Sequence, residues 1–448
     1  MTAFPPSKRL GCIADWLRTH PFTALGGVLL LVMGISFCRR HNSEWEQVYL
    51  LAAKHLWVGE DVYRMGESYL YPPFMAFAAL PFLALPAPLP RVLWFGVNVI
   101  CLAALLRWSW RVAGGRRLEG SARTNRSERL AAVLGCLCGI SYLENCLAHQ
   151  QTDIVIAALL SCGCLLLGRG RAMYAATAFG LASACKCTGL LWVPYLIWRG
   201  RPWAAGWLLI VALGMNLLPD LICPAPDGSC WIEEYASRFL KPLTAAGHYV
   251  GTWGSDAVYN QSLTGLGQRW CTTEWNWEPT DCTIGPRAPL VRPQTLRVIV
   301  YGVELSLLAV ILWISGRPFH NLREDDGGAR HALECGMLLL LMVLLSPMSS
   351  KAHFGTLVLP GFCLARTAIH SRGLLLKGML AAAVALGLLC NKDPLGERLY
   401  TLSLWYGVVT WQALILLAGC FLAYRQCRFT VARELPYPAG SSSAARAA

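Results

Sequence analysis

The residues best suited to chemistry lie in polar stretches between long apolar segments of the sequence. Glu44 and Glu46 follow the first apolar segment directly, and Asp61 lies further along the same stretch. A carboxylate beside a hydroxyl group can act as a general base and remove its proton. We therefore predict these three acids as the candidate catalytic residues, with Glu44 and Glu46 ahead of Asp61.

A second set of polar side chains lies at the ends of later apolar segments or in a long loop. Lys186, Lys351 and His353 offer positive charge or N–H donors, which would stabilise a leaving phosphate. The candidate substrate-binding residues are His149, Gln151, Asp153, Lys186, Asn260, Gln261, Lys351 and His353.

The elements that must position these residues are expected to be membrane helices. The chain has 448 residues, of which 55% are hydrophobic and only 15% charged. Apolar segments of spanning length recur along it, which is typical of a polytopic membrane protein. We predict one membrane domain over 1–448 with twelve crossings, several of them short. They lie near 22–38, 92–110, 130–147, 152–168, 172–186, 188–199, 203–220, 296–314, 332–347, 354–367, 374–390 and 402–424.

The basic residues predict the orientation of these crossings. With the N-terminus inside, segment 107–129, which holds seven arginines, falls on the cytoplasmic side. The other turns assigned to that side are basic as well, in agreement with the positive-inside rule. The net charge of +13 is therefore explained by topology, and no nucleic-acid partner is expected. Both termini are predicted to be cytoplasmic, and the protein is expected to lie in a plasma or inner membrane.

The opposite face then carries two long loops, at 39–91 and 221–295. Within the first, residues 71–89 are apolar but rich in proline, and a full crossing there would reverse the charge pattern. We expect a re-entrant or interfacial helix at this place. The second loop holds Cys223, Cys230, Cys271 and Cys282. Four cysteines in one extracytoplasmic loop favour two local disulfides, Cys223–Cys230 and Cys271–Cys282, with free thiols as the alternative.

All the candidate site residues fall on this non-cytoplasmic face. Each one alone has an ordinary explanation as a solvated charge, a lysine extending to the headgroups or a structural histidine. Ionisable groups near membrane depth are costly, however, and usually line a cavity. Their joint placement on one face favours a functional site. The carboxylates are too scattered in sequence to predict a metal site, and no cofactor is expected.

Several short motifs give the chain a resemblance to a known family. Glu44 precedes Trp45 and Tyr49, and the stretches GEDVY and YLYPPF follow. Further along come HQQTD, ACKCTGLLWVPY, NQSL and LLSPMSSKAHF. In this order and spacing the sequence resembles the polyprenyl-phosphate-mannose-dependent mannosyltransferases of the GT-C superfamily, also called glycosyltransferase family 87. The resemblance covers most of the chain, from Glu44 to His353.

The resemblance implies an all-α GT-C-type transmembrane bundle with interfacial helices in the first outer loop. It implies an inverting glycosyltransferase that moves a hexose, with mannose expected, from a polyprenyl-phosphate donor to a glycan or glycolipid acceptor. The catalytic base of the family is an Asp in the first outer loop, and Glu44 or Glu46 matches that position. Ala352 replaces the first of two paired histidines, and Asp153 replaces an Asn. A transporter and a catalytically inactive scaffold are the alternatives to an enzyme.

Overall fold

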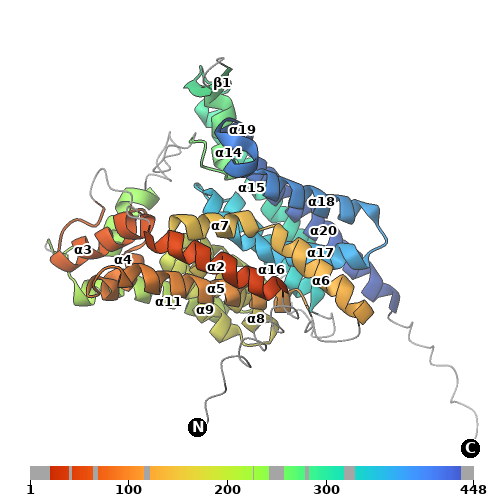
Figure 1. The fold of residues 1–448 in the computed structure, drawn as a ribbon, viewed down its shortest axis with the longest axis horizontal. Helices are drawn as coiled ribbons and strands as arrows, with labels where there is room; N and C mark the ends of the chain where they lie inside the picture. Colours follow the sequence, from red (N-terminus) through yellow and green to blue (C-terminus); the bar gives the residue numbers. More distant parts are fainter. Residues whose placement is uncertain are drawn as a thin grey trace, which may run out of the picture.

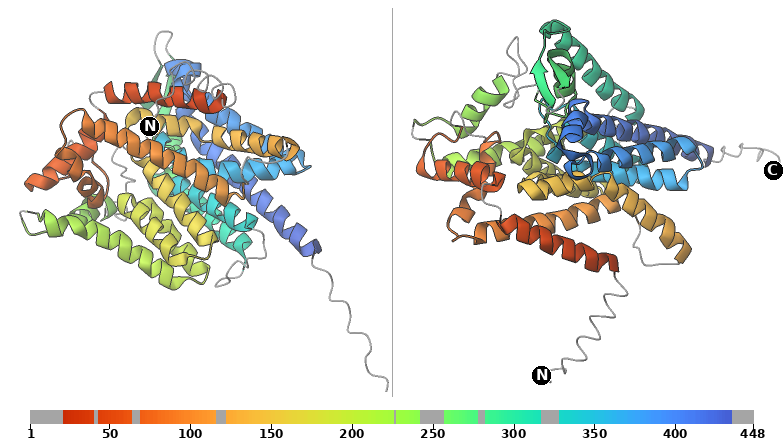
Figure 2. Two further views of the ribbon diagram at one scale, coloured as in Figure 1. Left: turned by 60° about the horizontal axis from the view of Figure 1, so that its bottom comes forward. Right: turned by 45° about the horizontal axis from the view of Figure 1, so that its top comes forward.

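The structure is a computed structural model that describes residues 21–39, 43–63, 69–115, 122–225, 227–241, 257–277, 282–316 and 328–434. Helices dominate these residues, and they form one bundle (Figure 1; two further views are in Figure 2). In the N-terminal half the elements are α2 (Pro21–Arg39), η1 (Trp45–Leu50), α3 (Leu51–Val58), α4 (Pro73–Leu83), α5 (Leu89–Val112), α6 (Ala122–Leu137), α7 (Ile140–His149), α8 (Asp153–Gly168), α9 (Ala172–Cys185), η2 (Cys187–Leu191), α10 (Trp192–Trp198) and α11 (Pro202–Ile222).

The C-terminal half continues the bundle after a segment of shorter elements. These are α12 (Trp231–Tyr235), η3 (Ala236–Leu240), α14 (Leu263–Thr272) and an antiparallel hairpin of β1 (Thr273–Trp277) and β2 (Cys282–Pro286). They are followed by α15 (Pro293–Ser315), α16 (Ala329–Leu344), η5 (Lys351–Leu357), α17 (Val358–His370), α18 (Leu374–Leu389), α19 (Lys392–Trp405) and α20 (Val408–Glu434).

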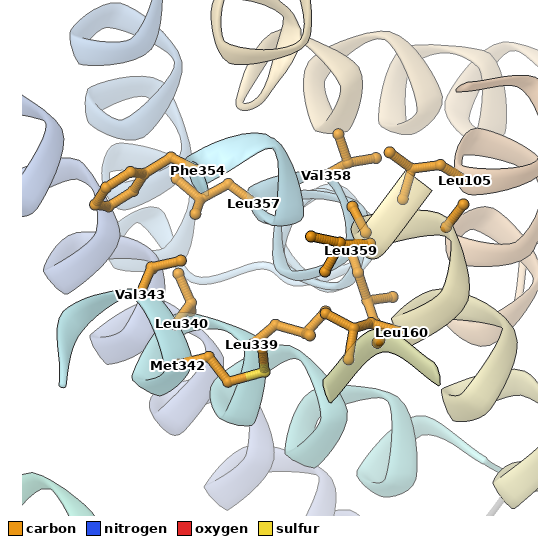
Figure 3. Close-up of a cluster of buried hydrophobic side chains, with 14 of the residues drawn as sticks. Leu105, Leu160, Leu339, Leu340, Met342, Val343, Phe354, Leu357, Val358 and Leu359 are labelled. Carbon is orange, nitrogen blue, oxygen red and sulfur yellow. The ribbon is translucent and has the colours of Figure 1, made fainter. Parts of the chain in front are cut away.

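Helices α16 and α17 form the centre of the bundle. Every residue of α16 from Ala332 to Leu344 is buried, and α16 packs against both α17 and α20. Figure 3 shows leucines of α16 facing Leu359 of α17 and Leu160 of α8. From Cys335 to Leu344 the helix has no polar residue, so it needs protein or lipid on every side. The position of α16 in the centre supplies protein all around it.

Close contact between α6 and α17 depends on glycines. A Cβ built on Gly361 would lie 2.7 Å from the carbonyl oxygen of Gly135. Small residues let helix backbones approach in membranes, where apolar side chains gain nothing by leaving lipid. The pair therefore brings α17, and η5 just before it, against the α6–α7 segment.

The predicted helices agree with the structure. All twelve predicted crossings fall on helices, and residues 71–89 contain the short helix α4. Within the described residues, five helices are long and apolar enough to cross a membrane, or up to seven if two bent pairs count as single spans. The chain is thus an all-α, multi-pass membrane protein; the number of twelve crossings remains a prediction.

The structure differs from the prediction at three breaks. The segment 130–147 is two helices, α6 and α7, bent by 48°. The segment 402–424 is interrupted at Gly407, whose φ of 73° ends the preceding helix. The helix before this break, α19, was missed, and it turns by 94° from α18. α19 is rich in charged residues, so apolar periodicity gave no signal for it.

The predicted disulfide between Cys223 and Cys230 is wrong. Both residues are free thiols, Cys223 buried and Cys230 exposed. The indole Nε1 of Trp231 donates to the carbonyl oxygen of Cys223 (2.7 Å), and the Trp231 amide donates to Asp220. These bonds close the loop without a covalent link. Cys271 is also a free thiol, and the side chain of Cys282 lies outside the described residues.

Candidate active site

The turn between α7 and α8 positions several of the predicted residues. α7 ends at His149, and Gln150 follows in the left-handed conformation, with φ of 59°. Its carbonyl oxygen accepts from Trp94 Nε1 (3.0 Å), and its own Nε2 donates to the carbonyl oxygen of Phe37 (2.8 Å). The turn is therefore fixed to α5 and α2. It directs Gln151 and Asp153 to one place.

Glu44 meets this turn from the opposite side. It precedes η1, and its Oε2 accepts a hydrogen bond from Gln151 Nε2 over 2.7 Å. His149 Nδ1 lies 3.7 Å from Glu44 Oε1, and both side chains are partly open to solvent. Burial raises the pKa of Glu44 above 4.5, while the hydrogen bond from Gln151 opposes that rise. Glu44 is thus an accessible carboxylate with raised basicity.

Asp153, Lys186 and His353 form the buried side of the same site. Lys186 Nζ donates to Asp153 Oδ1 over 2.9 Å, and His353 Nε2 lies 3.9 Å from that oxygen. Residue Lys186 ends α9, and His353 lies on η5. The backbone N–H of Ser350 donates to His353 Nδ1 (3.2 Å), so in the neutral ring Nε2 carries the proton. His353 therefore presents an N–H donor to the site.

These five residues, Glu44, Gln151, Asp153, Lys186 and His353, are called the first polar cluster below. They interact as one group, because the charge of Asp153 raises the pKa of Glu44 and the charge of Lys186 lowers it. Two buried acceptors in the cluster, Gln151 Oε1 and Asp153 Oδ2, have no hydrogen-bond partner among the described residues. Buried polar atoms are normally paired, so these oxygens are available to accept hydrogen bonds from a substrate.

A largely apolar pocket of about 320 Å³ opens beside Lys186. Its walls come from α9–η2, from the α12–η3 segment and from the chain after α16. The lining side chains include Leu191, Tyr235, Phe239, Met342 and Met348, with Lys186 as the charged residue. A ligand with an apolar chain and an anionic end would satisfy both parts of this pocket.

The α12–η3 segment is held over the pocket by an ion pair to the first loop. Arg238 Nη2 lies 2.8 Å from Asp61 Oδ2 and 2.7 Å from Glu234 Oε1. Arg238 also donates to the carbonyl oxygen of Tyr63, whose ring contacts Tyr235. Asp61 is therefore held in an ion pair with the α12–η3 segment and is not part of the first polar cluster.

Glu46 is also placed apart from the cluster. Its Oε1 accepts from Arg91 Nε over 2.5 Å, and Arg91 donates as well to the carbonyl oxygen of Cys38. The guanidinium is largely buried, at 9% side-chain exposure. This pair joins η1 to the start of α5. Of the two candidate glutamates, only Glu44 faces the other predicted residues.

Asn260 and Gln261 are fully buried and use their amides to hold other segments. Asn260 Nδ2 donates to the carbonyl oxygen of Pro347 (3.0 Å), and its Oδ1 accepts from the Ser349 amide (3.1 Å). Gln261 Nε2 donates to the carbonyl oxygen of Leu404 (2.8 Å). The two residues fasten the segment that leads to His353, and they do not face the pocket.

Lys351 points away from the first polar cluster. Its Nζ donates to the carbonyl oxygen of Cys390 (2.7 Å) and to Asn391 Oδ1 (2.6 Å), at the corner between α18 and α19. Residues 351 and 353 differ by two positions in a 3₁₀ helix, so their side chains leave it in different directions. The structure therefore separates this lysine from His353.

Sequence reasoning missed the aromatic wall of the site. Lys186 Nζ lies 5.5 Å from the ring centroid of Tyr71, a cation–π distance. Tyr71 packs on Tyr49, whose hydroxyl is 3.2 Å from Thr152 Oγ1. The signal was available, because Tyr71 lies in the YLYPPF motif between polar segments. No group of three His, Cys, Asp or Glu residues in the described ranges could hold a metal ion.

Comparison with known proteins identifies the family. The model of "Glycosyltransferase family 87" matches residues 69–347. No curated protein matches the chain. The fold is similar to crystal structures of ArnT from Cupriavidus metallidurans in the apo state (14% identity, TM-score 0.37, covering 91% of this chain and 76% of that one) and bound to undecaprenyl phosphate (15% identity, TM-score 0.34, covering 92% and 78%). The family match spans more than half of the chain, and this protein therefore belongs to glycosyltransferase family 87 and is a membrane glycosyltransferase.

Proposed function

We propose that the protein transfers a hexose, with mannose the first candidate, from a polyprenyl-phosphate donor to a glycan or glycolipid acceptor on the extracytoplasmic face. The observation that carries the proposal is the first polar cluster, in which a carboxylate base and a lysine–histidine pair meet beside an apolar pocket. ArnT, in one of the similar structures, is bound to undecaprenyl phosphate, a lipid of the same chemical class.

The donor would bind with its phosphate at Lys186 and His353. One N–H of Lys186 is used by Asp153, which leaves its other donors for the phosphate oxygens. His353 adds the Nε2–H, and the fixed positions of both groups stabilise the charge that develops on the leaving phosphate. The first isoprene units of the tail would occupy the pocket beside Lys186.

Glu44 would act as the general base on the acceptor. The acceptor hydroxyl oxygen attacks the anomeric carbon while the bond from that carbon to the phosphate oxygen breaks. The hydroxyl proton passes to Glu44, and the electron pair leaves on the polyprenyl phosphate. One direct displacement inverts the anomeric configuration. Gln151 holds the carboxylate through its 2.7 Å hydrogen bond.

The test is turnover of purified protein with a panel of polyprenyl-phosphate hexoses and a mixed glycolipid acceptor extract. We expect sugar transfer by the wild type and a turnover lowered by about 10²–10⁴-fold in Glu44→Gln. A wild type that moves labelled donor across the bilayer without transferring sugar would establish the transporter alternative. A wild type that binds donor but turns over none of the panel would support the inactive scaffold.

A further inference from the structure

A second polar group lies apart from the first polar cluster, around the other charged residue of η5. It surrounds the Lys351 ammonium, which is held by Cys390 and Asn391. Its members come from α7, η5, α19 and the segment before α14. We call it the second polar cluster: Glu144, Lys351, Asp393, Tyr400 and Tyr259. Glu144 is close enough to interact electrostatically with Lys351 and Asp393, and Tyr400 with Glu144 and Tyr259.

Apart from the Lys351 ammonium, the polar ends of this cluster have no hydrogen-bond partner among the described residues. The carboxylates of Glu144 and Asp393 and the hydroxyls of Tyr400 and Tyr259 make no hydrogen bond or ion pair within the described ranges. Glu144, Asp393 and Tyr259 are exposed, the tyrosine at 63%. The side chain of Lys351 lies over the Tyr400 ring at 5.1 Å and is largely buried. The Lys351 ammonium and the Tyr400 ring are thus fixed beside accessible carboxylates and hydroxyls.

The second polar cluster is connected to Glu44 through α7. Glu144 lies on this helix, and His149 at its C-terminal end approaches Glu44. Ser141, one turn before Glu144, is buried, and its hydroxyl lacks a partner among the described residues. The side chains of His149 and Glu44 are partly exposed, whereas Lys186 lines the pocket and Asp153 is buried in its ion pair with Lys186. A molecule bound along α7 would therefore approach the partly exposed Glu44 by way of His149, which does not line the pocket.

The mixture of groups indicates the chemistry of that molecule. Carboxylates and tyrosine hydroxyls pair with sugar hydroxyls, and tyrosine rings pack on the apolar faces of sugars. The cluster holds two carboxylates and one ammonium, so a phosphorylated or otherwise anionic ligand would be repelled. A neutral, hydroxyl-rich ligand suits it better.

We infer that the second polar cluster binds the acceptor as a neutral glycan, with its attacking hydroxyl directed along α7 to Glu44. This inference rests on the proposed function, which makes the bound molecule the acceptor of the sugar. The arrangement gives the two substrates separate sites, with η5 as the wall between them. Glu144 and Asp393 would be binding residues that act on acceptor affinity and not on the donor.

The experiment measures ligand binding separately from turnover. Wild-type protein in nanodiscs is examined by saturation-transfer NMR with methyl α-mannoside, and with mannose 6-phosphate as the anionic counterpart. We expect a signal for the neutral glycoside that is lost in Glu144→Gln/Asp393→Asn and kept in Glu274→Gln. Glu274 is an exposed glutamate on β1, outside the cluster, and provides the matched control. If the double variant is not folded, Glu144→Gln alone takes its place.

Turnover then separates this inference from the proposed function. In the variant, the acceptor KM should rise about tenfold or more, the effect of one lost charge-assisted hydrogen bond, with the donor KM unchanged. Equal glycoside signals in wild type and variant, no glycoside signal in the wild type, or a stronger signal for mannose 6-phosphate would each overturn the acceptor site. Glycoside binding that depends on Glu144, without any transfer, would keep the binding site and reject the proposed reaction.

Discussion

Gln151 donates a hydrogen bond to Glu44 over 2.7 Å, and this bond joins two segments that are 107 residues apart in the sequence. Of the three acids predicted as the candidate base, Glu44 is therefore the one in contact with the other predicted residues. Glu46 is held by Arg91, and Asp61 by Arg238. The predictions below follow from these separate environments.

Glu44→Gln should lower turnover by about 10²–10⁴-fold, the usual contribution of a positioned base. Gln keeps the size of the side chain but cannot accept the proton. Burial disfavours the charged form of Glu44, so removal of that charge should not lower thermal stability. Turnover and melting temperature, measured on the same preparation, check both statements. Glu46→Gln is the comparison, and it should lose stability through the loss of its ion pair with Arg91, with a far smaller loss of turnover.

The pH dependence of kcat/KM should reflect the raised pKa of Glu44. The base works only as a carboxylate, so kcat/KM should rise with pH through a limb above 4.5. Loss of the Gln151 hydrogen bond removes the interaction that lowers this pKa. Gln151→Met should therefore move the limb to higher pH, while Gln268→Met on α14 should not. An unchanged limb in Gln151→Met would show that another group sets it.

Lys186→Met should destabilise the protein by about 3–5 kcal/mol, because it leaves Asp153 as an unpaired buried charge. Side-chain exposures of 15% for Lys186 and 6% for Asp153 place this pair away from solvent. Lys186→Met/Asp153→Asn should recover most of the stability but not donor binding. Thermal unfolding in detergent and donor titration provide the two measurements. If the double variant bound the donor as tightly as the wild type, Lys186 would not be part of the phosphate site.

Arg238→Gln should loosen the α12–η3 segment over the pocket. The ion pair with Asp61 is partly exposed, with side-chain exposures of 34% and 40%, so we expect a stability loss below about 1 kcal/mol. The tyrosine contacts of Tyr63 with Tyr235 remain. Hydrogen exchange over Trp231–Leu240 should become faster, and Asp61→Asn should give the same change. A loss of turnover in Asp61→Asn as large as in Glu44→Gln would make Asp61 the base.

The sequence predicted the helices better than it predicted the contacts between them. Apolar periodicity predicted α8 and α16 well, because a long apolar segment is stable only in a membrane or in a protein core. It failed for α19, where charged residues and Gly396 interrupt the pattern. Of the site, topology predicted one face for Glu44, Asp153, Lys186 and His353, and the structure brings these four residues together. It gave no means to see that Lys351, two residues before His353, points to a different cluster, because that depends on the turn of η5.

The Gln150 turn has a consequence for how this protein responds to its bilayer. Its amide is tied to Phe37 near the end of α2, a helix whose outer residues such as Leu31 are largely exposed, at 64%. A helix with such a lipid-facing surface adjusts its tilt to the thickness of the hydrocarbon layer. Tilting of α2 would pull on the residues that carry Gln151 and Asp153. We therefore expect the rate of sugar transfer to change with the lipid chain length of the bilayer.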